Sequence, residues 1–177
     1  YSDAPGVTIA PQPGTAGIAY LDYVTAGSPL QAAAYMAPLI ANLTALGLVA
    51  DDTIIGAPYD FRMPPKSLEL QGYFKGLQAS IEDVVTRTGQ KVVIVGHSMG
   101  NMVAQWLLQK SSTADWRAKH VARYLALGGP FGGSVEMVRT ISSGTTPAFG
   151  NMSIVPSDMM ARLGRSWGAV YSLLPVA

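Results

Sequence analysis

The sequence predicts an α/β protein with a mostly parallel sheet and helices on both faces. Segments with apolar residues at helical spacing alternate with short apolar segments typical of strands, which is the pattern of this class. Residues 91–95 (KVVIV) form a continuous apolar run, as expected for a strand buried on both faces of a parallel sheet. Because successive strands are separated by helices, parallel pairing is the expected arrangement.

The first half of the chain is expected to hold a strand, a helix, a short strand and a long helix. Residues 5–17 are rich in Gly and Pro and indicate an irregular loop. Residues 18–24 (IAYLDYV) then favour a short strand, and residues 29–47 favour a helix that ends at a glycine. Residues 52–57 (DTIIGA) indicate another short strand, and residues 68–88 an amphipathic helix with one apolar face.

The second half continues the alternation. The apolar run at 91–95 leads into a helix over 99–110, and residues 120–127 (HVARYLAL) favour a further strand. A glycine-rich turn follows at 128–133 (GGPFGG). Its last two glycines lack the spacing of a phosphate-binding loop, so we expect them to allow close backbone approach beside the turn at residues 96–100.

Composition excludes several function classes. The chain has 177 residues, a formal net charge of +1, no cysteine and two histidines. A charge this small, without a Lys/Arg cluster, argues against nucleic acid as a partner. The lack of cysteine excludes a disulfide scaffold, a thiolate metal site and a cysteine nucleophile. No metal site and no cofactor is expected, and the apolar stretches are too short to span a membrane.

A G-x-S-x-G motif at residues 96–100 carries the predicted chemistry. It stands between a strand and a helix, where this pattern forms a nucleophile elbow with the serine at its apex. We therefore expect Ser98 to be a catalytic nucleophile and the backbone N–H of Met99 to donate to an oxyanion. A second match at residues 164–168 follows no strand, so Ser166 is interpreted as a chance occurrence.

No general base or acid for Ser98 is evident in the sequence. His97 is adjacent to the serine and is expected to point away from it, and His120 comes too early for the Ser–acid–His order of hydrolases. Neither Asp115, Glu136 nor Asp158 clearly ends a strand. We expect the acid and the histidine to lie outside this chain, together with the first strands of the fold and the second oxyanion donor. The fold would then be incomplete at both ends.

Four sequence blocks stand out together. They are APYDFR at 57–62, VVIVGHSMGNM at 92–102, LALGGPFGGS at 125–134, and Arg165-Ser166 with YSLLP at 171–175. In this combination they resemble the lecithin–cholesterol acyltransferase family, which includes lysosomal phospholipase A and the phospholipid:diacylglycerol acyltransferases. Phe61 and Phe131 stand where the family usually has tryptophan. The resemblance implies an α/β-hydrolase fold, with residues 1–140 in the core and residues 141–177 beginning a lid or an irregular connection.

The resemblance also implies the reaction. It points to cleavage of a phospholipid acyl ester through an acyl-Ser98 intermediate, with transfer of the acyl group to water, a sterol or another lipid alcohol. The implied partners are a membrane or lipoprotein surface and the rest of the same chain or a companion chain. Sequons at Asn42 and Asn151 favour the endomembrane lumen, a lysosome or secretion. Two alternatives stay open: a catalytically inactive structural subunit with this fold, and a carboxylesterase of small substrates.

Overall fold

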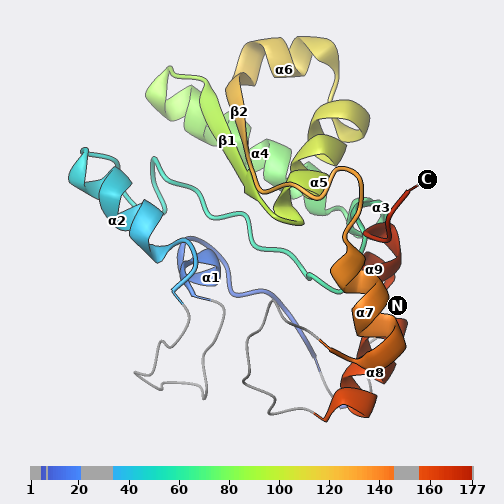
Figure 1. Cartoon of the computed structure of the whole chain (residues 1–177). Helices are drawn as coiled ribbons and strands as arrows, with labels where there is room; N and C mark the ends of the chain where they lie inside the picture. The colour runs from blue at the N-terminus through green and yellow to red at the C-terminus, as the bar shows by residue number, and fades with distance from the viewer. Residues whose placement is uncertain (1–4, 7, 21–33, 146–155, 177) are drawn as a thin grey trace. The chain divides into compact units, whose positions relative to one another are not determined.

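The computed structural model describes residues 5–6, 8–20, 34–145 and 156–176 (Figure 1). The chain divides into two compact units. The first comprises residues 1–60 with 82–90, and the second comprises residues 61–81 with 91–177. Residues 141–145 and 156–176 therefore belong to the same unit as the strands, and their assignment to a lid stays a prediction.

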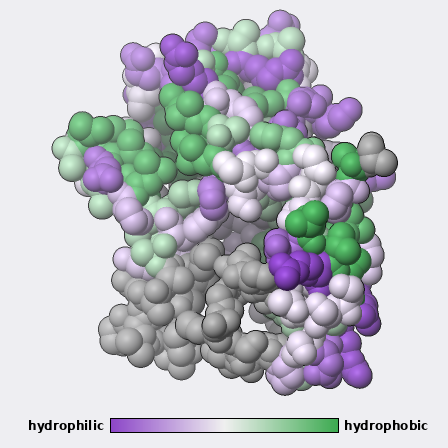
Figure 2. Space-filling view, viewed as in Figure 1, coloured by the Kyte–Doolittle hydropathy of each residue, from purple (hydrophilic) through white to green (hydrophobic). Residues whose placement is uncertain are grey.

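The first unit contains α1 (Ala16–Ala19), α2 (Ala37–Ala45) and the C-terminal half of α4 (Tyr73–Thr88). The loop before α1 is fastened by Asp51, whose carboxylate accepts the backbone N–H of Thr15 at 2.6 Å and its hydroxyl at 2.9 Å. None of the residues of α2 is buried, and Figure 2 shows apolar surface over this helix.

Three predictions for the first unit need correction. Residues 18 and 19 belong to α1 rather than to a strand, while residues 21–24 lie outside the described residues. The second helix begins at Ala37, because the chain first makes an antiparallel bridge between Tyr20 and Ala34, and residues 29–33 also lie outside the described residues. The predicted strand at 52–57 is reduced to a single bridge of Ile54 with Ala50, formed across a tight turn.

The second unit contains the strands and most of the helices. In chain order these are α3 (Pro65–Leu70), the first half of α4, β1 (Val92–His97), α5 (Gly100–Trp106), a π-helical turn η1 (Leu107–Ser111), α6 (Ala114–His120), β2 (Val121–Leu127), α7 (Val135–Ser143), α8 (Ser157–Ser166) and α9 (Gly168–Ser172). Phe74, Leu68 and Leu107 are its largest fully buried apolar side chains. The helix predicted over 68–88 is broken, because Gly72 adopts φ +79° between α3 and α4.

β1 and β2 pair in parallel, as predicted, with Val95 opposite Leu125 and His97 opposite Leu127. Because side chains alternate along a strand, the pairing places Val93, Val95, Leu125 and Leu127 on one face. Their exposed fractions are 51, 38, 48 and 45% respectively. The prediction that residues 91–95 are buried on both faces is therefore not met within the second unit, since no described element of that unit covers this face.

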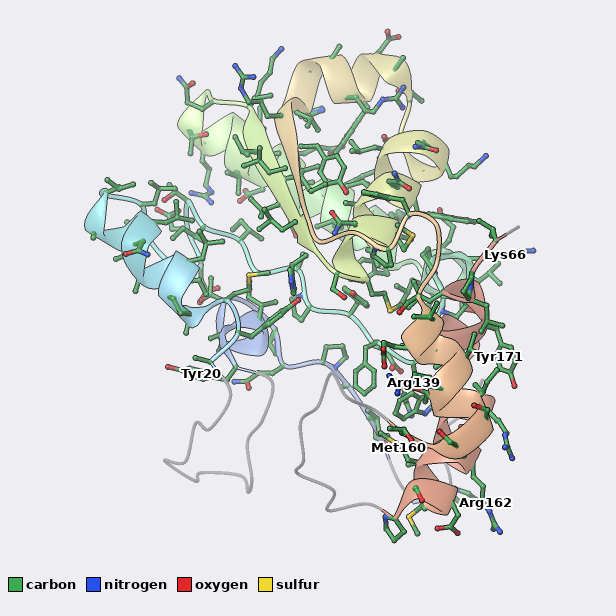
Figure 3. The ribbon with its side chains drawn as sticks, viewed as in Figure 1. Tyr20, Lys66, Arg139, Met160, Arg162 and Tyr171 are labelled. Atoms are coloured by element: carbon green, nitrogen blue, oxygen red, sulfur yellow. The ribbon has the colours of Figure 1, made fainter. Side chains whose placement is uncertain are left out.

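α7 and α8 follow the sheet and pack closely on each other; Figure 3 labels Arg139 on α7 and Met160 on α8. A β-carbon on Gly164 would stand 2.7 Å from Cγ2 of Thr140, so the missing side chain permits the close approach of the two helices. On α8, Met159 is 52% exposed.

Candidate active site

Ser98 lies at the turn between β1 and α5, where the sequence places it. Its φ is +51°, and among the described residues Asp51 is the one other non-glycine residue with a positive φ. This conformation brings the β-carbon close to the following carbonyl and costs about 1–2 kcal/mol for a residue other than glycine. The serine is exposed. The strand, the strained turn and the helix together have the local geometry of a nucleophile elbow.

Met99 is the N-cap residue of α5, which continues into η1. Its carbonyl accepts the N–H groups of Met102 at 2.9 Å and Val103 at 3.4 Å, as the first turn of a helix requires. Among the described residues, the Met99 N–H itself donates to no acceptor. The turn therefore presents an unpaired backbone donor beside the Ser98 side chain.

Asn101 holds this turn against β2. Its Nδ2 donates to the carbonyl oxygen of Ser98 at 2.9 Å and to that of Leu127 at 3.0 Å. The same two carbonyls accept backbone N–H groups, from Asn101 at 3.0 Å and from Ser98 at 3.0 Å respectively. The hydroxyl of Tyr124 donates to Asn101 Oδ1 at 2.7 Å. Burial raises the pKa of the Tyr124 phenol, so the hydroxyl keeps its proton and stays a donor.

Two glycines make room for the Asn101 side chain. A β-carbon on Gly96 would lie 2.8 Å from Asn101 Oδ1, and one on Gly129 would lie 3.0 Å from Asn101 Cγ. The first glycine of the G-x-S-x-G motif thus serves the packing of a residue beyond the motif. The sequence analysis missed Asn101, although a polar residue in the first turn of a mostly apolar helix was an available signal.

Neither histidine is placed as the base for Ser98. His120 is buried, its Nδ1 lies 2.8 Å from the Trp116 carbonyl oxygen, and its ring contacts that of Trp116. It precedes β2, whereas Ser98 follows the parallel strand β1, so the two lie at opposite ends of the sheet, about 20 Å apart for strands of this length. His97 is the last residue of β1, and the side chains of successive residues diverge.

The three acidic residues that follow Ser98 in the sequence occupy equivalent positions in three different helices. Asp115, Glu136 and Asp158 stand in the first turns of α6, α7 and α8. A carboxylate there interacts favourably with the positive end of the helix dipole. α6 shows this capping most fully, because the Thr113 hydroxyl also accepts the Trp116 N–H at 3.1 Å. This position gives each of the three acids a structural role. Glu136 also pairs with Arg139 at 3.4 Å, and among the described residues its Oε2 is buried without a hydrogen-bond partner.

The second G-x-S-x-G match has a different structure. Ser166 is the last residue of α8, and its hydroxyl donates to the Leu163 carbonyl at 2.7 Å. A helix rather than a strand precedes it, and its backbone does not adopt a positive φ. The interpretation of this match as a chance occurrence agrees with that geometry.

Two of the recognised sequence blocks meet beyond β2. The N–H of Ser134 donates to the Leu173 carbonyl at 2.7 Å, and that of Val176 to the Gly132 carbonyl at 3.3 Å. Gly133 has φ +88°, and a β-carbon there would lie 2.5 Å from the Leu174 carbonyl oxygen. We expected Gly132 and Gly133 to approach the turn at Ser98. Gly133 instead approaches residues 173–175, the LLP segment.

The phenylalanine that replaces tryptophan in the APYDFR block keeps an aromatic contact. Phe61 meets Trp167 edge to face, with ring centroids 5.3 Å apart. Arg62 is buried, and its carbonyl accepts the Ala169 N–H at 3.0 Å. This segment therefore fastens the start of α9 within the second unit.

Within the described ranges, no group of three or more Asp, Glu or His side chains is arranged to hold a metal ion. No helix in those ranges is both long and apolar enough to cross a bilayer.

The lecithin:cholesterol acyltransferase family model matches residues 1–177. A phosphatidylcholine-sterol acyltransferase of Gallus gallus is 37% identical over 156 residues, covering 86% of this chain and 35% of the relative. A lysosomal phospholipase A and acyltransferase of Rattus norvegicus is 33% identical over 141 residues, covering 78% and 33%. The chain spans about a third of the length of these curated relatives. It belongs to the lecithin:cholesterol acyltransferase family.

Proposed function

We propose that this chain supplies the nucleophile of a serine-dependent lipid acyl hydrolase or acyltransferase with an α/β-hydrolase fold. The observation that carries the proposal is the exposed Ser98 at φ +51° on a strand–helix turn, in a chain of this family. The parallel pairing of β1, which leads into that turn, with β2 supports the fold assignment. The relatives named as acyltransferases and phospholipase A support the reaction class.

In the proposed mechanism, Ser98 Oγ attacks the carbonyl carbon of a phospholipid acyl ester. Its proton passes to a histidine that we place outside these residues, and the carbonyl oxygen becomes an oxyanion that the Met99 N–H stabilises. The intermediate collapses when the bond to the alcohol oxygen breaks, and the histidine protonates the departing lysophospholipid. Water or a lipid alcohol then attacks acyl-Ser98 and loses its proton to the histidine. The bond between the acyl carbon and Ser98 Oγ breaks, the histidine returns the proton to Oγ, and a fatty acid or a new ester leaves.

The substrate and acceptor classes follow from the relatives' names. Phosphatidylcholine as acyl donor and a sterol as acceptor are named for one group, and phospholipase A activity for the other. We propose that the chain works at a membrane or lipoprotein surface, with the acid and histidine of its triad in the rest of the same chain or in a companion chain. Residues 141–177 would begin the lid over the site.

The proposed location is the endomembrane lumen, a lysosome or the exterior. The name of the lysosomal relative supports this proposal. Asn42 of the first sequon is exposed on α2, so it has room for an N-linked glycan. Asn151 of the second sequon lies outside the described residues.

The test is release and transfer of acyl groups from phosphatidylcholine vesicles that contain a sterol, using the purified full-length protein. The proposal predicts that lysophospholipid appears together with free fatty acid or sterol ester, that Ser98→Ala abolishes both, and that Ser166→Ala retains both. Absence of all activity in the wild-type protein would favour the inactive structural subunit instead. Cleavage of short esters without cleavage of phospholipid would favour a small-substrate carboxylesterase.

A further inference from the structure

We propose that Asn101 is a positioning residue for catalysis, which fixes the direction of the Met99 N–H by holding the peptide group between Ser98 and Met99. The inference rests on the proposed function, because it assigns a role to a residue that supports the oxyanion donor. Asn101 does not touch the reacting atoms; it acts through the backbone of the turn.

The argument begins with the planarity of the peptide bond. The Ser98 carbonyl and the Met99 N–H lie in one rigid peptide plane, and within that plane they point in opposite directions. Asn101 holds the carbonyl end of this plane with two donors, its Nδ2 at 2.9 Å and its own N–H at 3.0 Å. A plane held at one edge cannot rotate freely, so these bonds also set where the N–H at the other edge points.

The amide of Asn101 is itself oriented without ambiguity. The carbonyls of Ser98 and Leu127 can only accept hydrogen bonds, so the nitrogen must face them, and the oxygen faces the Tyr124 hydroxyl at 2.7 Å. The residue is 0% exposed, the lowest value among the buried polar residues described. The side chain thus has three partners and is shielded from bulk solvent.

The bond from Asn101 to the Leu127 carbonyl ties the turn to the sheet. Leu127 is the last residue of β2, and its carbonyl also accepts the Ser98 N–H at 3.0 Å. Hydrogen bonds therefore anchor the peptide group that carries the proposed oxyanion donor to a strand rather than to a loop. Catalytic donors gain most from such preorganisation, because they need no rearrangement when charge develops on the substrate.

Removal of the amide should affect the transition state more than substrate binding. In Asn101→Ala the Ser98 carbonyl keeps its bond to the backbone N–H of residue 101 but loses the side-chain donor, and the plane gains freedom to tilt. Complete loss of an oxyanion donor lowers kcat about 10²–10³-fold. Misdirection of a donor that is still present should lower kcat about 10- to 100-fold, with KM changed less than about twofold.

The experiment measures kcat and KM for a p-nitrophenyl ester, and the affinity for a trifluoromethyl ketone that forms an oxyanion adduct, in the purified full-length protein. Asn101→Ala is compared with Gln78→Ala, which removes another structural amide. Gln78 lies on α4 and donates to the hydroxyl of Ser111, the last residue of η1, at 3.2 Å. Asn101→Ala should lose kcat and ketone affinity by the same factor. Gln78→Ala should change neither.

Tyr124→Phe keeps the inference testable should Asn101→Ala fail to fold. It removes the partner of Asn101 Oδ1 alone, and we expect a smaller parallel loss of kcat and ketone affinity, about two- to tenfold. Unchanged kcat and ketone affinity in a folded Asn101→Ala or in Tyr124→Phe, with Ser98→Ala inactive, would overturn the positioning role and leave the proposed function standing. Full activity of Ser98→Ala would instead overturn the proposed function itself.

Discussion

Gly96 and Asn101 approach so closely that a methyl group on Gly96 would lie 2.8 Å from Asn101 Oδ1 and 3.2 Å from the backbone nitrogen and Cα of the same residue. The side-chain oxygen has little room to move, because the Tyr124 hydroxyl holds it, and the backbone atoms belong to the first turn of α5. The tight fit of strand, turn and helix therefore depends on the absence of a side chain at Gly96.

Gly96→Ala should destabilise the protein by about 1–3 kcal/mol, as overpacking of a close contact does. Gly76→Ala is the matched control, because a β-carbon at this position of α4 meets no atom within 4 Å. Alanine in a helix is favoured over glycine by about 0.5–1 kcal/mol, so this variant should become more stable. Urea unfolding of both variants measures the difference, and equal effects of the two substitutions would contradict the packing described.

The positive φ of Ser98 predicts a conflict between stability and activity. Ser98→Gly removes the β-carbon that strains the turn at φ +51°, whereas Ser98→Ala removes the hydroxyl and retains the strain. Both variants should be inactive, but Ser98→Gly should be the more stable of the two by about 1 kcal/mol. Thermal unfolding compares them directly. Because glycine also gives the unfolded chain more freedom, by about 0.5–1 kcal/mol, greater stability of Ser98→Ala would contradict the strain in the turn.

Gly132 and Gly133 are neighbours that should respond differently to the same substitution. Gly133 has φ +88°, and a β-carbon there would lie 2.5 Å from atoms of Leu174 and Pro175, whereas one on Gly132 meets nothing within 4 Å. Gly133→Ala should therefore cost about 2 kcal/mol or more in the free energy of unfolding, and Gly132→Ala less than about 0.5 kcal/mol. Similar losses for both would argue against the close approach of the LLP segment.

The turn at Ser98 and the parallel strand pair were predictable because their signals are local. A continuous apolar run that ends in G-x-S-x-G specifies strand, sharp turn and helix within a dozen residues. The same holds for the second motif, where the helix before Ser166 distinguishes a chance match from an elbow. The candidate nucleophile thus follows from neighbouring residues alone.

The network around the nucleophile was not predictable, because it joins residues that are distant in the sequence. Nothing near Asn101 in the chain indicates that Tyr124 and Leu127 become its partners, since their meeting depends on the register of β2 against β1. Likewise, the approach of Gly133 to Pro175 depends on the placement of α7, α8 and α9 between them.

The errors in the element boundaries also have physical causes. Residues 18–24 have strand-forming side chains, yet the chain enters a short helix at Ala16, before the strand-like segment begins. The long helical pattern over 68–88 continues its apolar spacing across Gly72, where a positive φ breaks the helix. α6 was missed although Thr113 is a helix N-cap residue of the favoured type, because its helix has little apolar periodicity.

Tyr124 predicts a loss of stability in alkali. Burial raises the pKa of its phenol in the folded state above the ordinary value near 10. The folded protein then holds this proton more tightly than the unfolded chain does, so the contribution is complete below about pH 10 and declines as the pH rises further. Wild-type stability should fall relative to Tyr124→Phe as the pH rises above about 10. A stability difference that stays constant over this range would contradict the assignment.

The measurement that tests the central claim most directly is labelling of the purified full-length protein with a fluorophosphonate probe, followed by mapping of the labelled tryptic peptide. Cleavage after Lys91 and Lys110 gives a peptide in which Ser98 is the sole serine. The account predicts that this peptide carries the label, that Ser98→Ala abolishes it, and that Ser166→Ala retains it. Labelling that persists in Ser98→Ala, or that maps to the peptide beginning at Ser166, would contradict the assignment of Ser98 as the nucleophile.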